Sequence, residues 1–167
     1  MKNIEILEKI KVILTENKLS LSTAESCTGG LISSYLTDVS GASAYIFQNF
    51  VTYSNEAKNK ILGVKKSTLD KYGAVSENTA YEMSEGLLNM ADTSIATTGI
   101  LGPTGGSMEK PIGLCYISLG IKKDNKKKIE VIKYNSKEAK SNERIKIKCD
   151  IAKYALESFL EFLIKEV

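Results

Sequence analysis

Short segments rich in β-branched and aromatic residues alternate with segments of helical period along this chain of 167 residues. That alternation constrains the fold most, because it favours helices packed in layers on a sheet. Helices are expected over residues 1–18, 31–36, 56–62, 65–72 and 76–90, and one long helix or a helix pair over 137–165. Strands are expected over residues 19–24, 44–53, 93–98, 111–119 and 127–134. We predict a single mixed α/β layered domain over residues 1–167, with the last two strands antiparallel.

Capping residues mark several boundaries of these segments. Ser54 or Asn55 is expected to cap the helix over 56–62, and Gly63 is expected to end it. Ser76 is expected to cap the longer helix that follows. A capping serine or asparagine accepts hydrogen bonds from free N–H groups at the start of a helix, and glycine adopts the left-handed conformation that ends one.

The chain contains no histidine, so a Ser-His-Asp triad is impossible. A reactive hydroxyl would need a lysine, a tyrosine or a carboxylate as its base, and Ser-Lys pairs are a known variant. Ser43 follows a glycine turn, Tyr53 ends the predicted strand on the same face as Tyr45, and Lys58 lies early in the next helix. We predict Ser43, Tyr53 and Lys58 as catalytic. The same residue types also fit a turn serine, a core tyrosine and a surface lysine.

Two glycine-bearing loops are candidate binding elements. Thr28, Gly29 and Gly30 stand between a predicted strand and helix, where backbone N–H groups could cradle an anion or simply cap the helix. The loop over residues 99–107 holds four glycines, which suit either a ligand wall or a plain connection. Cys27 is a rival nucleophile within the first loop, although no histidine is present to activate it.

The charge and cysteine content exclude several classes of function. The chain has 23 Lys and Arg residues against 20 Asp and Glu residues, and Arg144 is its single arginine. Because nucleic-acid readers rely on arginine, we expect no nucleic-acid partner. Cys27, Cys115 and Cys149 lack metal-ligand spacing, so we expect free thiols in a reducing cytosol, with no metal and no cofactor. No apolar run reaches the roughly 20 residues that span a bilayer, so we expect a cytoplasmic protein without membrane contact.

Six ordered motifs resemble those of the C-terminal domain of the CinA (competence/damage-inducible) family. They are Ala24-Glu25-Ser26-Cys27-Thr28-Gly29-Gly30, Val51-Thr52-Tyr53-Ser54-Asn55-Glu56-Ala57-Lys58, Leu62-Gly63-Val64, Tyr72-Gly73-Ala74-Val75-Ser76, the segment Thr98 to Gly106, and Lys110-Pro111-Ile112-Gly113. The resemblance covers nearly the whole chain. It implies a three-layer α/β/α sandwich with a mixed central sheet that acts as a homodimer or higher homo-oligomer.

The resemblance also implies an activity, the conversion of nicotinamide mononucleotide and water to nicotinate mononucleotide and ammonia in pyridine nucleotide recycling. By position, the family's catalytic residues fall on Ser43, Tyr53 and Lys58. In the implied mechanism neutral Lys58 takes the proton of Ser43, Tyr53 relays or orients it, and an acyl-enzyme forms. The expected substrate-binding residues are Thr28, Gly29, Gly30, Gly102, Thr104, Gly105, Gly106 and Arg144.

The chain departs from the family pattern near Arg144. Asn142 and Glu143 stand where Gly and Asp are usual, Lys148 where Arg is usual, and Leu101 where Ala is usual. An alternative function is therefore a non-catalytic nucleotide-binding or competence-associated interaction module. Larger family members carry an N-terminal molybdopterin-binding-like domain, whose activities are not assigned to this chain.

Overall fold

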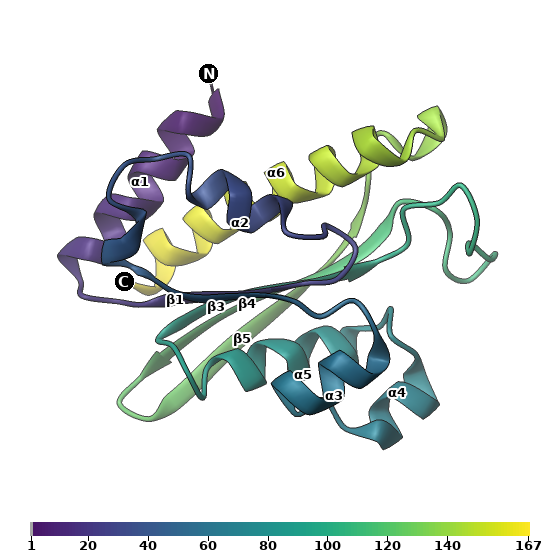
Figure 1. Cartoon of the computed structure of the whole chain (residues 1–167), viewed down its shortest axis with the longest axis horizontal. Helices are drawn as coiled ribbons and strands as arrows, with labels where there is room; N and C mark the ends of the chain where they lie inside the picture. Colours follow the sequence, from purple (N-terminus) through teal and green to yellow (C-terminus); the bar gives the residue numbers. More distant parts are fainter. Residues whose placement is uncertain (1) are drawn as a thin grey trace.

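The computed structural model describes residues 2–167 and forms a three-layer α/β/α sandwich around a mixed five-stranded sheet (Figure 1). The helices are α1 (Lys2–Glu16), α2 (Leu31–Leu36), α3 (Asn55–Leu62), α4 (Lys66–Tyr72), α5 (Glu77–Leu87) and α6 (Arg144–Glu166), with short 3₁₀ turns η1 (Ala42–Ala44) and η2 (Ala139–Ser141). The strands are β1 (Leu21–Glu25), β2 (Ile46–Val51), β3 (Thr93–Gly99), β4 (Leu114–Lys123) and β5 (Lys126–Asn135). The start of the first predicted helix, Met1, lies outside the described residues.

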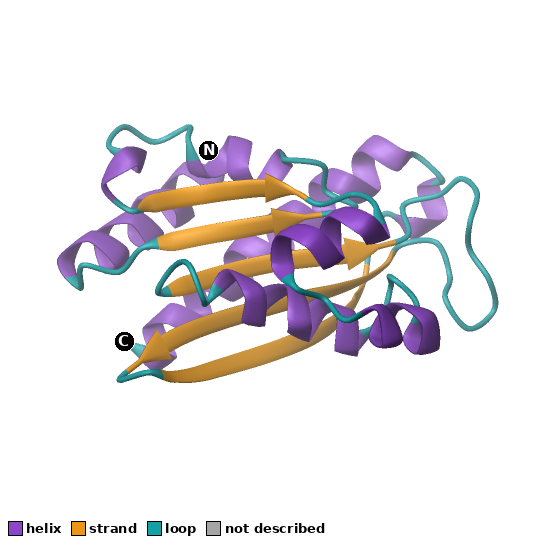
Figure 2. Cartoon of the chain, turned by 60° about the horizontal axis from the view of Figure 1, so that its bottom comes forward, coloured by secondary structure: helices purple, strands orange, loops and turns teal. Residues whose placement is uncertain are grey.

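The strand order is β2-β1-β3-β4-β5 (Figure 2). Strands β2, β1 and β3 run parallel, with Ala24 of β1 between Phe50 of β2 and Ala96 of β3. Strands β4 and β5 form the predicted antiparallel hairpin, and β4 pairs antiparallel with β3. Because parallel strands all end at the same edge of a sheet, the loops that follow β1, β2 and β3 meet there.

Helices cover both faces of the sheet. Helices α1, α2 and α6 lie on one face, and α3, α4 and α5 lie on the other (Figure 1). The larger core lies under the first group and includes Leu14, Ile95 and Phe159, whereas a smaller core under the second includes Leu62 and Met83. The sheet is therefore buried on both faces, which explains why β1 and most of β3 are buried throughout.

The predicted capping residues of α3 and α5 are confirmed. Ser54 Oγ accepts a hydrogen bond from the Ala57 N–H at 3.0 Å, and Gly63 ends α3 with φ of +73°. Ser76 Oγ accepts one from the Thr79 N–H at 3.1 Å. These local signals are read correctly from sequence because each depends on one backbone turn.

Several predicted boundaries are wrong. The strand expected over 44–53 is shorter, so Tyr45 and Tyr53 lie outside β2 and do not share a face: Tyr45 is buried, and Tyr53 is exposed. The strand expected from Pro111 begins at Leu114, after a turn at Gly113 with φ of +89°. The segment over 137–165, expected as one long helix or a helix pair, consists of the 3₁₀ turn η2, a break at Asn142 with φ of +54°, and then α6.

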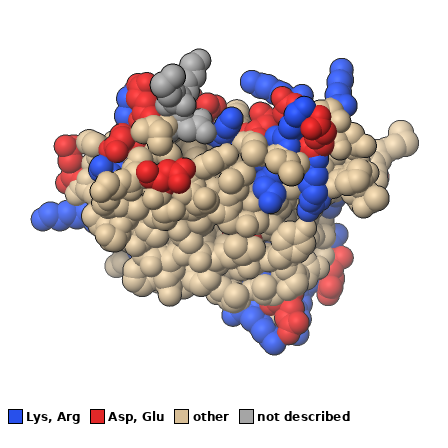
Figure 3. All heavy atoms as spheres, turned by 45° about the horizontal axis from the view of Figure 1, so that its top comes forward, with Lys and Arg blue, Asp and Glu red and all other residues tan. Residues whose placement is uncertain are grey.

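In Figure 3, charged side chains of both signs lie mainly along the rim of the face, around a broad area without charges, and no uniformly basic patch dominates this view. Within residues 2–167, none of the helices combines the length and the apolar character that a bilayer crossing needs.

Candidate active site

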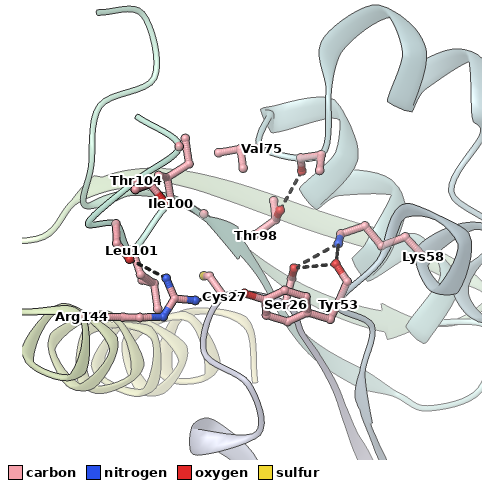
Figure 4. Close-up of a pocket in the computed structure, with 14 residues that line it drawn as sticks. Ser26, Cys27, Tyr53, Lys58, Val75, Thr98, Ile100, Leu101, Thr104 and Arg144 are labelled. Atoms are coloured by element: carbon pink, nitrogen blue, oxygen red, sulfur yellow. Dashed lines mark hydrogen bonds between the residues drawn. The ribbon is translucent and has the colours of Figure 1, made fainter. Parts of the chain in front are cut away.

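The carboxyl ends of β1, β2 and β3 bring three loops together around one pocket. Its volume is about 260 Å³. Strand β1 leads into Ser26 and Cys27, β2 leads into Tyr53, and β3 leads into the glycine-rich loop. Helix α6 adds Arg144 from the opposite side (Figure 4). The remaining wall is formed by Ala74, Val75, Thr98, Gly99, Ile100, Leu101, Gly102, Thr104 and Gly105.

Lys58 is the most unusual side chain of this pocket, because it is fully buried. Its Nζ donates hydrogen bonds of 3.0 Å each to Ser26 Oγ and to the backbone oxygen of Tyr53 (Figure 4). A third hydrogen bond of 3.0 Å goes to the backbone oxygen of Thr52. Burial lowers the pKa of Lys58 to about 8, and the charge of a Cys27 thiolate opposes that shift. The amine is therefore available in its neutral form near neutral pH.

The neutral amine matches its three partners in number and type. An uncharged amine has two N–H donors and one lone pair, and the carbonyls of Thr52 and Tyr53 only accept hydrogen bonds. With both N–H groups directed at those carbonyls, the lone pair is left for the hydroxyl proton of Ser26. Ser26 can thus donate to Lys58 when the amine is neutral, which is the geometry of a nucleophile with its base.

Glu25 fixes the loop that carries Ser26. Its carboxylate is fully buried and accepts hydrogen bonds from the N–H groups of Gly30, Ile32 and Ser33 and from the Ser33 hydroxyl, at 2.6 to 3.0 Å. The carboxylate therefore closes the turn between β1 and α2. Ser26 itself is anchored by its N–H, which donates to the Thr97 carbonyl at 3.0 Å.

The predicted anion cradle at Thr28, Gly29 and Gly30 is consequently wrong. Gly29 N–H donates to the Ser26 carbonyl, and Gly30 N–H donates to the Glu25 carboxylate. The Thr28 hydroxyl is buried against Thr97 at 2.8 Å. The chain's own carboxylate occupies the donors that a ligand would need, so this turn shapes the site from outside the pocket.

Ser43 lies far from Lys58, which corrects the predicted catalytic pair. It sits exposed on η1, ahead of β2, whereas Lys58 follows the other end of that strand. Six residues of extended chain separate the two ends by about 17 Å. The hydroxyl that contacts Lys58 belongs to Ser26, which the sequence analysis did not single out. The sequence feature that could have identified Ser26 is its position directly after a buried strand, at the edge where parallel strands end together.

Tyr53 lines the pocket as predicted and makes two contacts there. Its side chain is 60% exposed, and its hydroxyl accepts a hydrogen bond from Arg144 Nη2 at 3.0 Å. Its backbone oxygen binds Lys58 Nζ. The phenol hydroxyl therefore contacts Arg144, and the backbone carbonyl contacts the amine of Lys58. The relay role of the phenol stays a prediction.

Arg144 lies on the pocket wall, as predicted, and bridges two loops. Besides Tyr53 it binds the Gly102 carbonyl through Nη1 at 2.7 Å. Gly102, Thr104 and Gly105 also line the pocket. Gly106 lies outside the pocket wall, because it packs against Ile112, whose Cγ1 would be 2.9 Å from a Cβ at Gly106.

Comparison with known proteins agrees with this architecture. The model of the CinA C-terminal domain matches residues 3–163. A competence/damage inducible protein of Agrobacterium tumefaciens has a similar structure, with a TM-score of 0.88 and 39% identity, over 98% of this chain and 96% of that one. A competence damage-inducible protein of Klebsiella pneumoniae has a TM-score of 0.84 and 29% identity over 99% of both chains.

Sequence relatives point the same way. A CinA-like protein of Kosmotoga olearia is 54% identical over 119 residues, which cover 70% of this chain and 29% of that protein. Relatives from Thermoanaerobacter match over 96% of this chain, which spans 37% of their length. The fold and the site thus define an α/β/α domain with a lysine-contacted serine. The chain belongs to the CinA C-terminal domain family.

Proposed function

We propose that this domain is an amidohydrolase that converts nicotinamide mononucleotide and water to nicotinate mononucleotide and ammonia, with Ser26 as nucleophile and Lys58 as base. The observation that carries the proposal is the 3.0 Å contact between Ser26 Oγ and the buried Nζ of Lys58. Family membership supports the substrate, because the six motifs resemble those of nicotinamide mononucleotide deamidases.

The reaction begins with proton transfer from the Ser26 hydroxyl to neutral Lys58. Oγ attacks the carboxamide carbon, and the carbonyl oxygen takes the negative charge of a tetrahedral intermediate. The Lys58 ammonium then returns its proton to the amide nitrogen, and ammonia leaves an acyl-enzyme. Water, deprotonated by Lys58, attacks the ester carbon. The C–O bond to Ser26 then breaks, Oγ takes the proton back from Lys58, and nicotinate mononucleotide leaves. The Thr52 and Tyr53 carbonyls hold Nζ in place through each proton transfer.

The pocket suits the carboxamide end of the nucleotide. Its volume of about 260 Å³ is smaller than the ~300–1,000 Å³ usual for whole small-molecule ligands. The carboxamide and ring would fill it, and the phosphate would lie at its mouth. Arg144 has five N–H donors and uses one each on Gly102 and Tyr53, so others remain for an anionic group.

An ammonia-release assay with nicotinamide mononucleotide tests the proposal. Ser26→Ala should reduce kcat by more than about a thousandfold, the scale on which removal of a triad nucleophile acts. Ser34→Ala is the matched control, because Ser34 is exposed on α2. This substitution removes the same hydroxyl oxygen at a position outside the pocket. A Ser26→Ala variant with near wild-type turnover would refute the nucleophile. If the wild-type protein binds nicotinamide mononucleotide without releasing ammonia, the domain is the non-catalytic binding module instead.

A further inference from the structure

Two of the three cysteines meet beside the Ser26–Lys58 pair. The Sγ atoms of Cys27 and Cys115 are 3.7 Å apart, and both side chains are buried. Cys27 directly follows Ser26 and lines the pocket, whereas Cys115 lies near the start of β4. The two thiols approach each other across the end of β3 at Gly99. A Cβ at Gly99 would lie only 3.0 Å from Cα and Cβ of Cys115. Glycine at this position therefore allows the close approach of β4 at Cys115.

We propose that Cys27 and Cys115 form an oxidisable pair, whose disulfide disconnects Ser26 from Lys58 and switches the pocket off. The chemical partner is a peroxide, which reaches Cys27 through the pocket. The loss of activity rests on the proposed amidohydrolase function, but formation of the disulfide does not.

The electron and proton balance needs one peroxide for each pair. The Cys27 thiolate attacks one oxygen of hydrogen peroxide, the O–O bond breaks, and a sulfenic acid and hydroxide form. The Cys115 sulfur then attacks the Cys27 sulfur, the S–O bond breaks, and the departing hydroxide takes the Cys115 proton. Two thiols lose two electrons in total, and the peroxide is reduced to two molecules of water.

The environment assigns the two thiols different roles. Cys27 lines the pocket directly after Ser26, whereas Cys115 is fully buried and does not line it. Burial and contact with Cys27 raise the pKa of Cys115 well above its usual range. Cys27 is therefore the thiol that meets the oxidant, and Cys115 is the resolving thiol. Cys149 is outside this contact and only partly buried.

The disulfide draws the turn that carries Ser26 and Cys27 toward β4. An S–S bond is about 2.0 Å long, so the two sulfurs have to approach by about 1.7 Å from their present 3.7 Å. Cys115 belongs to a strand paired on both sides, whereas Cys27 belongs to a turn, so the turn has to yield. Ser26 moves with it, and a misplacement of about 1 Å costs a catalytic site about a hundredfold in rate.

The test oxidises the intact protein with hydrogen peroxide and follows mass and activity together. Wild-type protein should lose two hydrogen masses, give a Cys27–Cys115 peptide after digestion without reductant, and lose about a hundredfold in ammonia release. Dithiothreitol should restore both. Cys115→Ala should form no such peptide, and Cys149→Ala, the matched control, should respond like the wild-type protein. Cys115→Ser is the second variant should the alanine variant fold poorly.

Three results would overturn the proposal. If both thiols remain reduced in the wild-type protein, Cys27 and Cys115 are not an oxidisable pair. A cross-link that involves Cys149 would exclude the pair as well. The Cys27–Cys115 peptide could also form while ammonia release stays unchanged, which excludes the switch. A reduced protein that never releases ammonia would count against the amidohydrolase, and the peptide map would then decide the oxidisable pair alone.

Discussion

Two serines stand at opposite ends of neighbouring parallel strands, and comparing them shows what places only one of them against the buried lysine. Ser26 follows β1 at the carboxyl edge of the sheet, is nearly buried, and contacts the buried amine of Lys58. Ser43 precedes β2 at the amino edge and lies exposed on a 3₁₀ turn. Ser43 is nearer to Lys58 in sequence, yet the sheet carries them apart. Strand direction, and not closeness along the chain, therefore selects the serine.

Lys58→Met should give the largest loss at the carboxyl edge. Methionine fills a similar buried volume but accepts no proton, so ammonia release should fall by about 10²–10⁴-fold, the range of general-base catalysis. Lys60→Met is the matched control, because Lys60 lies on the same helix in an exposed pair with Glu56. Circular dichroism checks that both variants fold. A Lys58→Met variant with wild-type turnover would remove the amine from the reaction.

The pH dependence of kcat/KM should reveal the same amine. Below its pKa of about 8, Lys58 is protonated and cannot accept the Ser26 proton, so the rate should fall about tenfold per pH unit. At pH 6 the loss should be about a hundredfold relative to the plateau above pH 8. A profile that is flat from pH 6 to 9 would contradict a lysine base.

The lowered pKa of Lys58 should also make the stability of the protein depend on pH. Unfolded Lys58 binds its proton up to about pH 10.5, whereas folded Lys58 releases it near pH 8. Between these values the unfolded chain binds more protons, so the free energy of unfolding rises with pH, by about 3 kcal/mol from this group. Urea titrations of the wild-type protein and Lys58→Met should diverge in that window. Parallel curves would indicate that the pKa is ordinary.

Glu25→Gln should have the next largest effect, because it replaces one acceptor of the turn by a donor. A glutamine amide keeps one acceptor oxygen, so it cannot accept from all three backbone N–H groups and the Ser33 hydroxyl. The donors left without an acceptor should lower the free energy of unfolding by about 1–3 kcal/mol. Displacement of Ser26 should lower kcat by about tenfold or more, with KM changed less. Ser33→Ala, which removes only the hydroxyl donor, should be milder. Equal effects of the two variants would deny Glu25 its positioning role.

Arg144→Lys should mainly weaken substrate binding. A lysine cannot hold Gly102 and Tyr53 at once and still offer further donors to an anion. The KM for nicotinamide mononucleotide should rise about tenfold, which corresponds to ~1.4 kcal/mol. Lys146→Ala, which removes an exposed cation of the same helix, is the control and should leave KM unchanged. A tenfold fall in kcat at constant KM would instead place Arg144 in the chemical step.

Much of the fold was predictable, because it depends on local patterns. The helix caps at Ser54 and Ser76, the helix end at Gly63 and the final hairpin each depend on a few neighbouring residues, and each is confirmed. The layered α/β/α architecture is confirmed too. Boundaries failed where a turn replaced extended chain, as at Tyr45.

The site was only partly predictable, because it depends on which strands are neighbours. Lys58 and Arg144 were identified and do line the pocket. The partner of Lys58 was assigned wrongly, since Ser26 and Lys58 are 32 residues apart and meet only after β1 and β2 pair in parallel. The role of Glu25 was likewise missed, because a buried carboxylate facing N–H groups of its own chain leaves no periodic signal.

Ser43→Ala should have the smallest effect, and it tests the comparison from the other side. Ser43 is exposed on η1, and the strand β2 separates it from the pocket, so loss of its hydroxyl removes no contact to Ser26 or Lys58. The free energy of unfolding should change by less than about 0.5 kcal/mol, as for ordinary surface substitutions. Ammonia release should equal that of the wild-type protein. If Ser43→Ala abolished turnover while Ser26→Ala kept it, the amino edge of the sheet would hold the nucleophile, and the chain would have to rearrange around β2 before reacting.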